Sequence, residues 1–593
     1  MCAIHGIFKK DFPLISKMVV AAHHRGPDAN SFYTDDYISL GHNLLSIVDK
    51  EENSVQPWSH NNLVLVYNGE IYNYKELGQE FDLKTNTDTE VIIKGIEKYG
   101  DSFLDKLDGM FGLAYYDKRT KRITLARDSN GIKPVYYGYH NNTLSFSSEI
   151  KSLLELGFER RICKQALSHY HKAGYNSGYL TMFEGIQKLV PGEVRTYDVI
   201  EGNLITKRNL NNYKYEYQGH DEIRDRFNYS GKQTLMGRRN IGLFLSGGID
   251  SSSILYEMKE LGTKPLTFTS AFETIDPNSR LNEDSDLAKL YSSQLDVFNN
   301  IIHQTQTDYV DVIEDTFYAL EEPRQGKSFP TYYNTNKFIS QNNITVTLAG
   351  DGGDELFGGY KHHKFPDWKG KLETISKHNK QLRNPELSCT VDDMMDYLND
   401  WLPTEPMTGD KLNDFMYIEC LNSLCDDFLI RNDKLGMTFS MEGRFPFMNK
   451  SIRDYVRAIP SQIKISPFFD KQPLVQNKHL QKIAYKNRLP DYLLTHVKTG
   501  WRFPTDEILI GNRDNPAPNN GVLKDYIRMV LNDREIREIF EFNDTDIEDR
   551  YLNNRDHQPI GSKSKADIGL KSQKELFLIL NFAVWKKVYR MSL

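Results

Sequence analysis

The sequence predicts a protein of two domains: an N-terminal α+β half of sheets packed between helices, and a C-terminal α/β half on a parallel sheet. At 593 residues the chain is too long for a single hydrophobic core. Residues 1 to about 200 are rich in short β-branched and aromatic runs, whereas strand and helix patterns alternate from about residue 220. After about residue 365 the pattern becomes mostly helical.

In the N-terminal half, strands are predicted wherever β-branched and aromatic residues cluster. The clearest are 63–67, 111–116, 122–126 and 143–146. A helix is predicted over Thr89–Tyr99, with Asp88 as its N-cap. The polar stretch Asn203–Gly219 is predicted to connect the halves, which gives domains of residues 2–200 and 201–593.

In the C-terminal half, alternating strands and helices predict a parallel sheet, whose ligands bind beyond the carboxyl ends of the strands. The expected strands are 241–245, 266–271, 297–302 and 344–348, and the expected helices are 251–261, 283–295 and 309–320. Farther along, 511–521 is predicted as a polar loop and Lys574–Arg590 as a final amphipathic helix.

The strongest chemical signal begins at the end of the first of these strands. There the run Leu245-Ser246-Gly247-Gly248-Ile249-Asp250-Ser251-Ser252 joins a buried strand to a helix N-terminus. Backbone N–H groups in such a turn, with the positive end of the helix dipole, bind phosphate. Asp250 adds a carboxylate able to hold Mg²⁺, and the run lacks the Gly-Lys-Ser/Thr ending of a Walker loop.

A second glycine loop follows the last of the expected strands. It reads Ala349-Gly350-Asp351-Gly352-Gly353-Asp354 and is followed by Glu355-Leu356-Phe357-Gly358-Gly359-Tyr360. Because parallel strands present their carboxyl ends at one edge of the sheet, both glycine loops are expected to reach the same crevice.

The N-terminus carries a second kind of signal. If Met1 is removed, Cys2 has both a thiol and a free α-amine of near-neutral pKa, so one residue supplies a nucleophile and its base. Three further motifs accompany it: His24-Arg25-Gly26-Pro27-Asp28, Tyr67-Asn68-Gly69-Glu70-Ile71-Tyr72-Asn73 and Thr87-Asp88-Thr89-Glu90. With them, the N-terminal half resembles a class II glutamine amidotransferase of the N-terminal-nucleophile type.

The serine–glycine loop resembles the PP-loop of ATP pyrophosphatases, and the two halves together resemble glutamine-hydrolysing asparagine synthetase over essentially the full length. Further matching motifs are Ala126-Arg127-Asp128, Phe146–Lys151, Met441–Phe447 and Lys498-Thr499-Gly500-Trp501. The resemblance implies an N-terminal-nucleophile αββα sandwich over residues 2–200. A PP-loop synthetase domain with a helical C-terminal part would follow over 201–593.

In the N-terminal half, the resemblance implies that Cys2 attacks the glutamine amide and forms a thioester. The Asn68 side chain and the N–H of Gly69 would form the oxyanion hole, where negative charge develops. Glu70 and Asp88 would hold the α-ammonium of glutamine.

In the C-terminal half, the resemblance implies an ATP site made of Leu245, Ser246, Gly247, Gly248, Asp250, Ser251, Ser252, Gly350 and Asp351. Asp250 and Asp354 would hold Mg²⁺ on the pyrophosphate. Lys498 would contact the phosphates and the intermediate. Asp351 would stand beside the reacting carboxylate and the incoming ammonia.

Three positions depart from the family pattern. Leu44 stands where the family has an arginine that grips the glutamine α-carboxylate. Losing one partner of a buried charge pair costs about 2–5 kcal/mol, which would weaken glutamine binding tens to thousands of fold. Either another arginine such as Arg25 substitutes, or ammonia is used better than glutamine. Arg324 and Asn449 also deviate from the commonest forms near the acceptor pocket, so the acceptor acid stays open.

The resemblance implies ATP-dependent amidation of L-aspartate to L-asparagine through a β-aspartyl-adenylate, with ammonia from glutamine and release of AMP and pyrophosphate. Three alternatives stay open. One is a relative that amidates another carboxylate, such as a sugar acid, a natural product or a peptide. The second is a hydrolase or ammonia-dependent ligase with an impaired glutaminase half, and the third is a non-catalytic nucleotide-binding protein.

Composition narrows the partners. A net charge of −7 argues against nucleic acid. No apolar run approaches the roughly 18 residues of a membrane span, so a membrane is not expected as partner. Five cysteines without metal-type spacing fit a reducing cytoplasm, and Cys420 and Cys425 are expected to be core thiols in a helix. A homodimer is expected only from the family.

Overall fold

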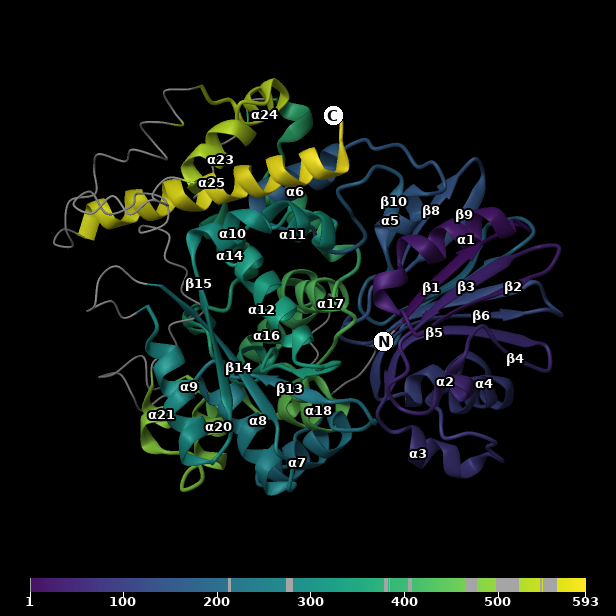
Figure 1. The fold of residues 1–593 in the computed structure, drawn as a ribbon, viewed down its shortest axis with the longest axis horizontal. Coiled ribbons are helices and arrows are strands. Elements are labelled where there is room, and N and C mark those ends of the chain that lie inside the picture. The colour runs from purple at the N-terminus through teal and green to yellow at the C-terminus, as the bar shows by residue number, and fades with distance from the viewer. Residues whose placement is uncertain are drawn as a thin grey trace.

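The computed structural model describes residues 2–211, 215–273, 281–377, 382, 384–403, 408–465, 477–496, 522–543, 547 and 563–593, excluding the side chains of 563–573. An N-terminal half of two sheets, purple to blue, lies beside a C-terminal half in which helices surround one sheet (Figure 1). The predicted fold class is confirmed for both halves. Among the described residues, none of the helices combines the length and apolar character needed to cross a membrane.

The N-terminal half is a sandwich of two six-stranded antiparallel sheets. The first has the order β10-β8-β9-β1-β3-β2, with β1 Ala3–Ile7, β2 Ala29–Thr34, β3 Ser39–Leu44, β8 Tyr136–His140, β9 Thr143–Ser147 and β10 Ile186–Lys188. The second has the order β12-β11-β7-β6-β5-β4, with β4 Trp58–His60, β5 Leu63–Ile71, β6 Gly109–Asp117, β7 Arg122–Arg127, β11 Glu193–Asp198 and β12 Leu204–Asn209. One apolar core joins the sheets: Ile4 and Phe146 of the first pack with Val66 and Ala114 of the second.

Helices cover the outer faces of this sandwich (Figure 1). Helices α1 (Phe12–Ala21) and α5 (Ile150–Leu154) lie on the first sheet, and α4 (Asp88–Tyr99) lies on the second. The sequence predicted Asp88 as the N-cap of α4, and this prediction is wrong. The cap is Thr87, whose hydroxyl accepts a hydrogen bond from the backbone N–H of Glu90 at 3.3 Å.

The polar stretch Asn203–Gly219, predicted as the connection between the halves, begins as a strand. Strand β12 pairs with β11 at the edge of the second sheet. Its side chains are largely exposed, so it lacks the alternation of apolar and polar residues by which a half-buried strand is recognised.

The C-terminal half contains a parallel sheet of order β15-β14-β13-β16-β17. Its strands are β13 Ile241–Phe244, β14 Leu266–Phe272, β15 Asn299–Gln304, β16 Val346–Leu348 and β17 Glu442–Arg444. The order reverses between β13 and β16, and such a switch point opens a crevice beyond the strand ends. The two glycine loops leave β13 and β16 there. The three-residue β17 was not predicted, because it is too short to show a period.

The predicted alternation of strand and helix is confirmed, although the predicted helix over 309–320 is two helices. The helices around the sheet are α7 Ile223–Thr234, α8 Ile249–Glu260, α9 Glu283–Gln294, α10 Gln306–Asp311, α11 Ile313–Leu320 and α12 Phe329–Gln341. The remaining helices are α2 Glu51–Ser54, α3 Tyr74–Leu77, α6 Lys164–Ala173, α13 Gly353–Phe357, α14 Trp368–Ser376, α15 Val391–Asn399, α16 Lys411–Glu419, α17 Ile430–Met437, α18 Lys450–Ala458, α19 Ser461–Lys464, α20 His479–Ala484, α21 Asp491–Thr495, α23 Val522–Val530, α24 Arg534–Phe540 and α25 Lys563–Tyr589. A π-helix, η6 (Cys420–Leu429), joins α16 to α17 and buries the free thiols of Cys420 and Cys425, as expected for core cysteines.

Helix α25, the long yellow helix in Figure 1, is not amphipathic where its side chains are described. From Leu576 to Trp585 these side chains are all buried. Helices α11, α23 and α24 pack against α25, and the polar Asn581 is buried with its apolar neighbours. Lys587, near the end of the helix, is exposed. The predicted loop at 511–521 lies outside the described residues.

Candidate active sites

Cys2 lies just before β1. The N-terminal end of the chain is marked between the two halves in Figure 1. The backbone N–H of Cys2 donates to Oδ1 of Asn68 at 3.0 Å, and its carbonyl accepts a hydrogen bond from Nε of Arg25 at 3.1 Å. Burial raises the pKa of the Cys2 thiol to about 11, although a hydrogen bond from the backbone of Leu45 opposes the shift. The thiol is therefore protonated at neutral pH and needs a base to become a nucleophile.

Asn68 and Gly69 lie on β5 beside this cysteine. Because the amide oxygen of Asn68 is held by Cys2, its Nδ2 points elsewhere, and this buried atom has no hydrogen-bond partner among the described residues. A Cβ at Gly69 would lie 2.0 Å from the carbonyl oxygen of Met110, so no larger residue fits there. An unpaired donor beside a buried thiol suits an oxyanion hole.

Two buried carboxylates complete this centre. Asp88 accepts hydrogen bonds from the hydroxyl of Tyr67 at 2.8 Å and the backbone N–H of Ile71 at 3.0 Å. Burial raises its pKa, and these hydrogen bonds limit the shift. Burial, together with the neighbouring Glu442, also raises the pKa of Glu70, although Arg444 of β17 lies 3.4 Å from its Oε1. A bound ammonium would stabilise both carboxylates in their charged form.

The family has an arginine for the glutamine α-carboxylate where this chain has Leu44, and the sequence left Arg25 as its possible substitute. Leu44 is a buried residue at the end of β3. Arg25 is fully buried, and its Nη1 lies 2.7 Å from both Glu149 and Asp433. Its guanidinium therefore fastens the two halves together and is not presented to a substrate carboxylate. A different cation lies near Cys2. Nη2 of Arg238 donates to the hydroxyl of Ser46 at 3.1 Å, and Ser46 follows Leu45, whose backbone bonds the Cys2 thiol.

The departures near the expected acceptor pocket have structural roles. Arg324 is buried and donates to the backbone carbonyl of Asp426. Asn449 is the N-cap of α18, accepting from the backbone N–H of Ser451 at 3.0 Å. Neither residue lines the cavity described next.

A cavity of about 520 Å³ opens beyond the carboxyl ends of β13 and β16. Of the predicted ATP-site residues, Leu245, Ser246, Gly248, Asp250, Ser251, Gly350 and Asp351 line it. Gly247 and Ser252 do not. Gly247 has φ +75° and packs so closely on α9 that a Cβ would lie 2.2 Å from the carbonyl oxygen of Asp284. The sequence thus identified one crevice from two separate loops.

Asp250 and Asp354 converge on one cation position, which the ammonium of Lys478 occupies. Its Nζ contacts Oδ2 of Asp250 and lies 2.7 Å from Oδ1 of Asp354. The other carboxylate oxygen of Asp250 is buried and accepts no hydrogen bond from the described residues. Two carboxylates with an orphaned oxygen form a donor set that fits Mg²⁺, a cation that prefers oxygen ligands.

Lys478 is a site residue that the sequence reasoning missed. It follows no recognisable motif, and a lysine in a polar stretch gives no signal of its own. Its backbone has φ +57°, a region that residues other than glycine rarely adopt and that occurs often at functional sites. Lys482 lines the same cavity one helical turn later, and burial together with Lys478 lowers its pKa to about 8. The predicted Lys498 lies outside the described residues.

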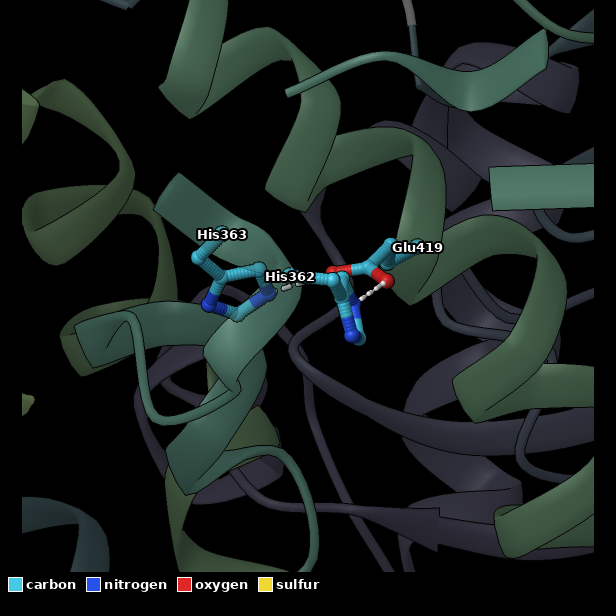
Figure 2. A group of neighbouring side chains, drawn as sticks. All are labelled: His362, His363 and Glu419. Atoms are coloured by element: carbon cyan, nitrogen blue, oxygen red, sulfur yellow. Dashed lines mark hydrogen bonds and ion pairs between the residues drawn. The ribbon is translucent and has the colours of Figure 1, made fainter. Parts of the chain in front are cut away.

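A cluster of His362, His363 and Glu419 supports the loop after the second glycine motif. Figure 2 shows the imidazoles of His362 and His363 beside the carboxylate of Glu419. The Nε2 atom of each ring lies 2.6 Å from a carboxylate oxygen. Their ligand-capable atoms lie within 4.8 Å of one another, as in a metal site. However, Nδ1 of His363 accepts the backbone N–H of Tyr360, so its Nε2 carries the proton, and Lys371 also pairs with Glu419. The groups of this cluster therefore pair with one another and with Lys371, and the bond from Tyr360 to His363 holds the loop at Tyr360, which lines the cavity described above.

Comparison with known proteins finds two family models. A glutamine amidotransferase domain matches residues 1–208, and an asparagine synthase model matches residues 222–571, more than half of the chain. Asparagine synthetase [glutamine-hydrolyzing] 1 of Bacillus subtilis is 27% identical over 609 residues, covering 90% of this chain and 93% of that protein. Asparagine synthetase B of Escherichia coli is 30% identical, covering 64% and 68%. A protein of Gibberella zeae named amidase chry2 is 26% identical, covering 81% and 83%.

Proposed function

We propose that this chain converts L-aspartate to L-asparagine. The proposal starts from the family: the chain belongs to the asparagine synthase family and carries an N-terminal glutamine amidotransferase domain. The family and its two-domain architecture confirm the resemblance found in the sequence. They make the chain a glutamine-hydrolysing ligase that uses ATP to amidate a carboxylate. Aspartate as the acceptor, the adenylate and the residue roles are the proposal.

At the first centre, Cys2 attacks the amide carbon of glutamine after Met1 is removed. Its own α-amine, placed by Asn68 Oδ1, takes the thiol proton and passes it to the departing nitrogen, which leaves as ammonia. The oxyanion is held by Asn68 Nδ2 and the N–H of Gly69. Glu70 and Asp88 bind the substrate ammonium. Water then hydrolyses the thioester to release glutamate.

Ammonia must reach the second centre without becoming ammonium. An apolar cluster spans the junction, with Tyr72, Met110 and Ile132 from the N-terminal half. Ala349 and Leu424, which belong to the same cluster, also line the ATP cavity. Such a surface offers ammonia no proton, so we propose that it travels along this cluster.

At the second centre, a carboxylate oxygen of aspartate attacks the α-phosphorus of ATP and pyrophosphate leaves. The backbone N–H groups around Ser246 and Gly248 bind phosphate, and the ammonium of Lys478 stabilises the negative charge on the leaving pyrophosphate. Bound between Asp250 and Asp354, Mg²⁺ would neutralise charge on the pyrophosphate. Ammonia then attacks the acyl carbon, Asp351 accepts a proton, and AMP leaves with asparagine formed.

The observation that carries this proposal is the convergence of Asp250 and Asp354 on one cation position at the mouth of the parallel sheet. The test supplies Mg²⁺-ATP and L-aspartate with either glutamine or ammonium, and measures asparagine by mass spectrometry. Asparagine from both donors supports the full proposal. Asparagine from ammonium alone would make the glutaminase half impaired, and none from either would contradict aspartate as acceptor.

A further inference from the structure

Glutamine carries one charge that the mechanism at Cys2 leaves without a partner. The two acidic side chains of this centre are proposed to hold its α-ammonium, but its α-carboxylate also needs a partner when it leaves water. Leu44 offers no charge. Arg25 is fully buried and lies 2.7 Å from two carboxylates of the protein. A cation for the glutamine carboxylate must therefore come from another segment.

The segment after α7 brings an arginine of the C-terminal half to the loop that follows β3. In this β3 loop, residues 45–49, the backbone of Leu45 bonds the Cys2 thiol, and Ser46 comes next. The backbone N–H of Arg238 donates to the carbonyl of Ile47 at 3.0 Å, and its Nη2 donates to the hydroxyl of Ser46 at 3.1 Å. Backbone and side chain together thus hold Arg238 on the loop beside the nucleophile.

The same segment also reaches an acidic residue of the Cys2 centre. The carbonyl of Met236 accepts a hydrogen bond from Nη1 of Arg444, and Nη2 of Arg444 lies 3.4 Å from Oε1 of Glu70. One residue separates Met236 from Arg238. The segment therefore connects the pair of Arg444 and Glu70 to the loop next to Cys2.

The far end of the β3 loop contacts the segment that carries Asp88. Oδ2 of Asp49 accepts a hydrogen bond from the backbone N–H of Asn86 at 3.3 Å, and Asp88 lies two residues farther along. Burial would raise the pKa of Asp49, but its hydrogen bonds and the positive charge of Arg238 lower it. The charge of Arg238 thus acts on a loop that runs from the nucleophile to a carboxylate proposed for the ammonium. In glutamine the ammonium and the carboxylate share one carbon, so their binding groups must be neighbours.

Arg238 has donors to offer an anion. It is exposed, and among the described residues its side chain makes one hydrogen bond, to Ser46, and no ion pair. The neighbouring Arg239, by contrast, pairs with Asp28 at 2.7 Å. A guanidinium with unused donors beside a substrate site is suited to a carboxylate that the protein itself does not supply.

We propose that Arg238, a residue of the C-terminal half, binds the α-carboxylate of glutamine in the Cys2 centre. This role rests on the glutaminase chemistry proposed for Cys2 and not on the identity of the acceptor. The substrate site of one half is then completed by the other half, and an apolar residue is tolerated at position 44. Because Arg238 is exposed, water screens its charge, so it binds the carboxylate less tightly than a buried arginine would.

The test compares L-glutamine with L-glutaminamide, in which an uncharged amide replaces the α-carboxylate. Hydrolysis of the γ-amide is followed by mass spectrometry as glutamate or isoglutamine, with Mg²⁺-ATP present and no acceptor. The wild-type protein should prefer glutamine by about tenfold or more in kcat/KM, the size expected of one charged hydrogen bond.

The variant Arg238→Gln should lose that preference. Its kcat/KM for glutamine falls about tenfold, to the level of glutaminamide, whose own value is unchanged. Arg238→Lys should recover part of the preference, because the charge returns without the planar pair of donors. Arg239→Gln is the matched control: it removes a charge from the same segment, and any effect on the loop should change both amides alike.

A cation restored at position 44 gives a second, independent readout. Leu44→Arg introduced into Arg238→Gln should bring the preference for glutamine back. Its gain should be larger there than in the wild-type protein, because the two cations would bind the same carboxylate and their effects would not add.

Two results would overturn the proposal. A wild-type protein that hydrolyses glutamine and glutaminamide equally well would show that no cation binds the α-carboxylate. A preference retained in Arg238→Gln, with thermal stability unchanged, would assign the carboxylate to another residue. The failure of the proposed function looks different: glutamate formed without asparagine from L-aspartate refutes only the acceptor. No product from either amide would refute both the glutaminase chemistry of Cys2 and the role of Arg238.

Discussion

The two centres hold their charges in different ways. In the Cys2 centre, the charged groups are buried and contact protein partners: Asp88 accepts from Tyr67, and Glu70 lies beside Arg444. In the ATP cavity, Lys478 neutralises the two carboxylates that are suited to Mg²⁺. The carboxylates of the first centre therefore keep their protein partners when a substrate ammonium binds beside them, whereas the lysine of the second must give way when a metal binds between Asp250 and Asp354.

One short helix connects the two centres. On α17, Arg431 lines the ATP cavity and Asn432 donates to Asp351 of that cavity. The next residue, Asp433, pairs with Arg25, whose Nε donates to the carbonyl of Cys2. The next residue, Lys434, lies 3.3 Å from Glu149 of the N-terminal half. Consecutive side chains of one helix thus contact residues of both centres.

The largest predicted effect disturbs the cavity alone. Asp250→Asn leaves Lys478 with one carboxylate and removes a metal ligand, so pyrophosphate release should fall by about 1,000-fold or more with either nitrogen donor. The control is Asp286→Asn, an exposed carboxylate in the first turn of α9. A normal rate in Asp250→Asn would remove this residue from the metal site.

The next effect is confined to the Cys2 centre. Asn68→Ala removes the Nδ2 donor and should lower glutamine hydrolysis by about 100- to 1,000-fold. Ammonium-dependent synthesis should be unchanged, because β5 does not reach the cavity. Steady-state rates with the two donors measure both. An equal loss with ammonium would show that the two centres are not separable.

A smaller gain is expected from restoring the missing cation. Leu44→Arg should lower the KM for glutamine about tenfold, because a charged hydrogen bond contributes about 1.5 kcal/mol or more. Arg238→Gln should be compared with it, since Arg238 contacts Ser46 near Cys2. If Leu44→Arg changes nothing while Arg238→Gln raises the KM, Arg238 already holds the glutamine carboxylate.

The smallest effect is a pH dependence of the cavity. Burial and Lys478 lower the pKa of Lys482 to about 8, so Lys482 loses its charge as the pH rises through 8. Protonated lysine attracts phosphate, and the KM for ATP should therefore rise by up to about tenfold between pH 7 and 9. Lys482→Arg should show a flat profile over that range. A flat profile in the wild-type protein would mean that Lys482 does not contact ATP.

The sequence predicted what depends on local pattern. The strands β5, β6, β7 and β9 of the first half, the strands β13 to β16 of the second, and the crevice at β13 and β16 follow from periodicity and from glycine loops at strand ends. Both loops bring their aspartates into one cavity, as expected from the geometry of parallel strands.

The misses depend on contacts between distant segments. Aspartate is a residue type that commonly caps helices, but the carboxylate of Asp88 accepts hydrogen bonds from Tyr67 and Ile71 instead. Thr87 caps the helix in its place. Lys478 reaches Asp250 only through the tertiary fold. The stretch Leu576–Trp585 of helix α25 is buried on all sides because other helices pack against it, which its own sequence does not specify.

The central claim is that two separable centres share one chain, and Cys2→Ala tests it most directly. Asparagine is quantified with glutamine or with ammonium as nitrogen donor, in the wild-type protein and in the variant. The account predicts that the variant makes no asparagine from glutamine and keeps the wild-type rate with ammonium. Equal loss with both donors, in a variant of unchanged thermal stability, would contradict it.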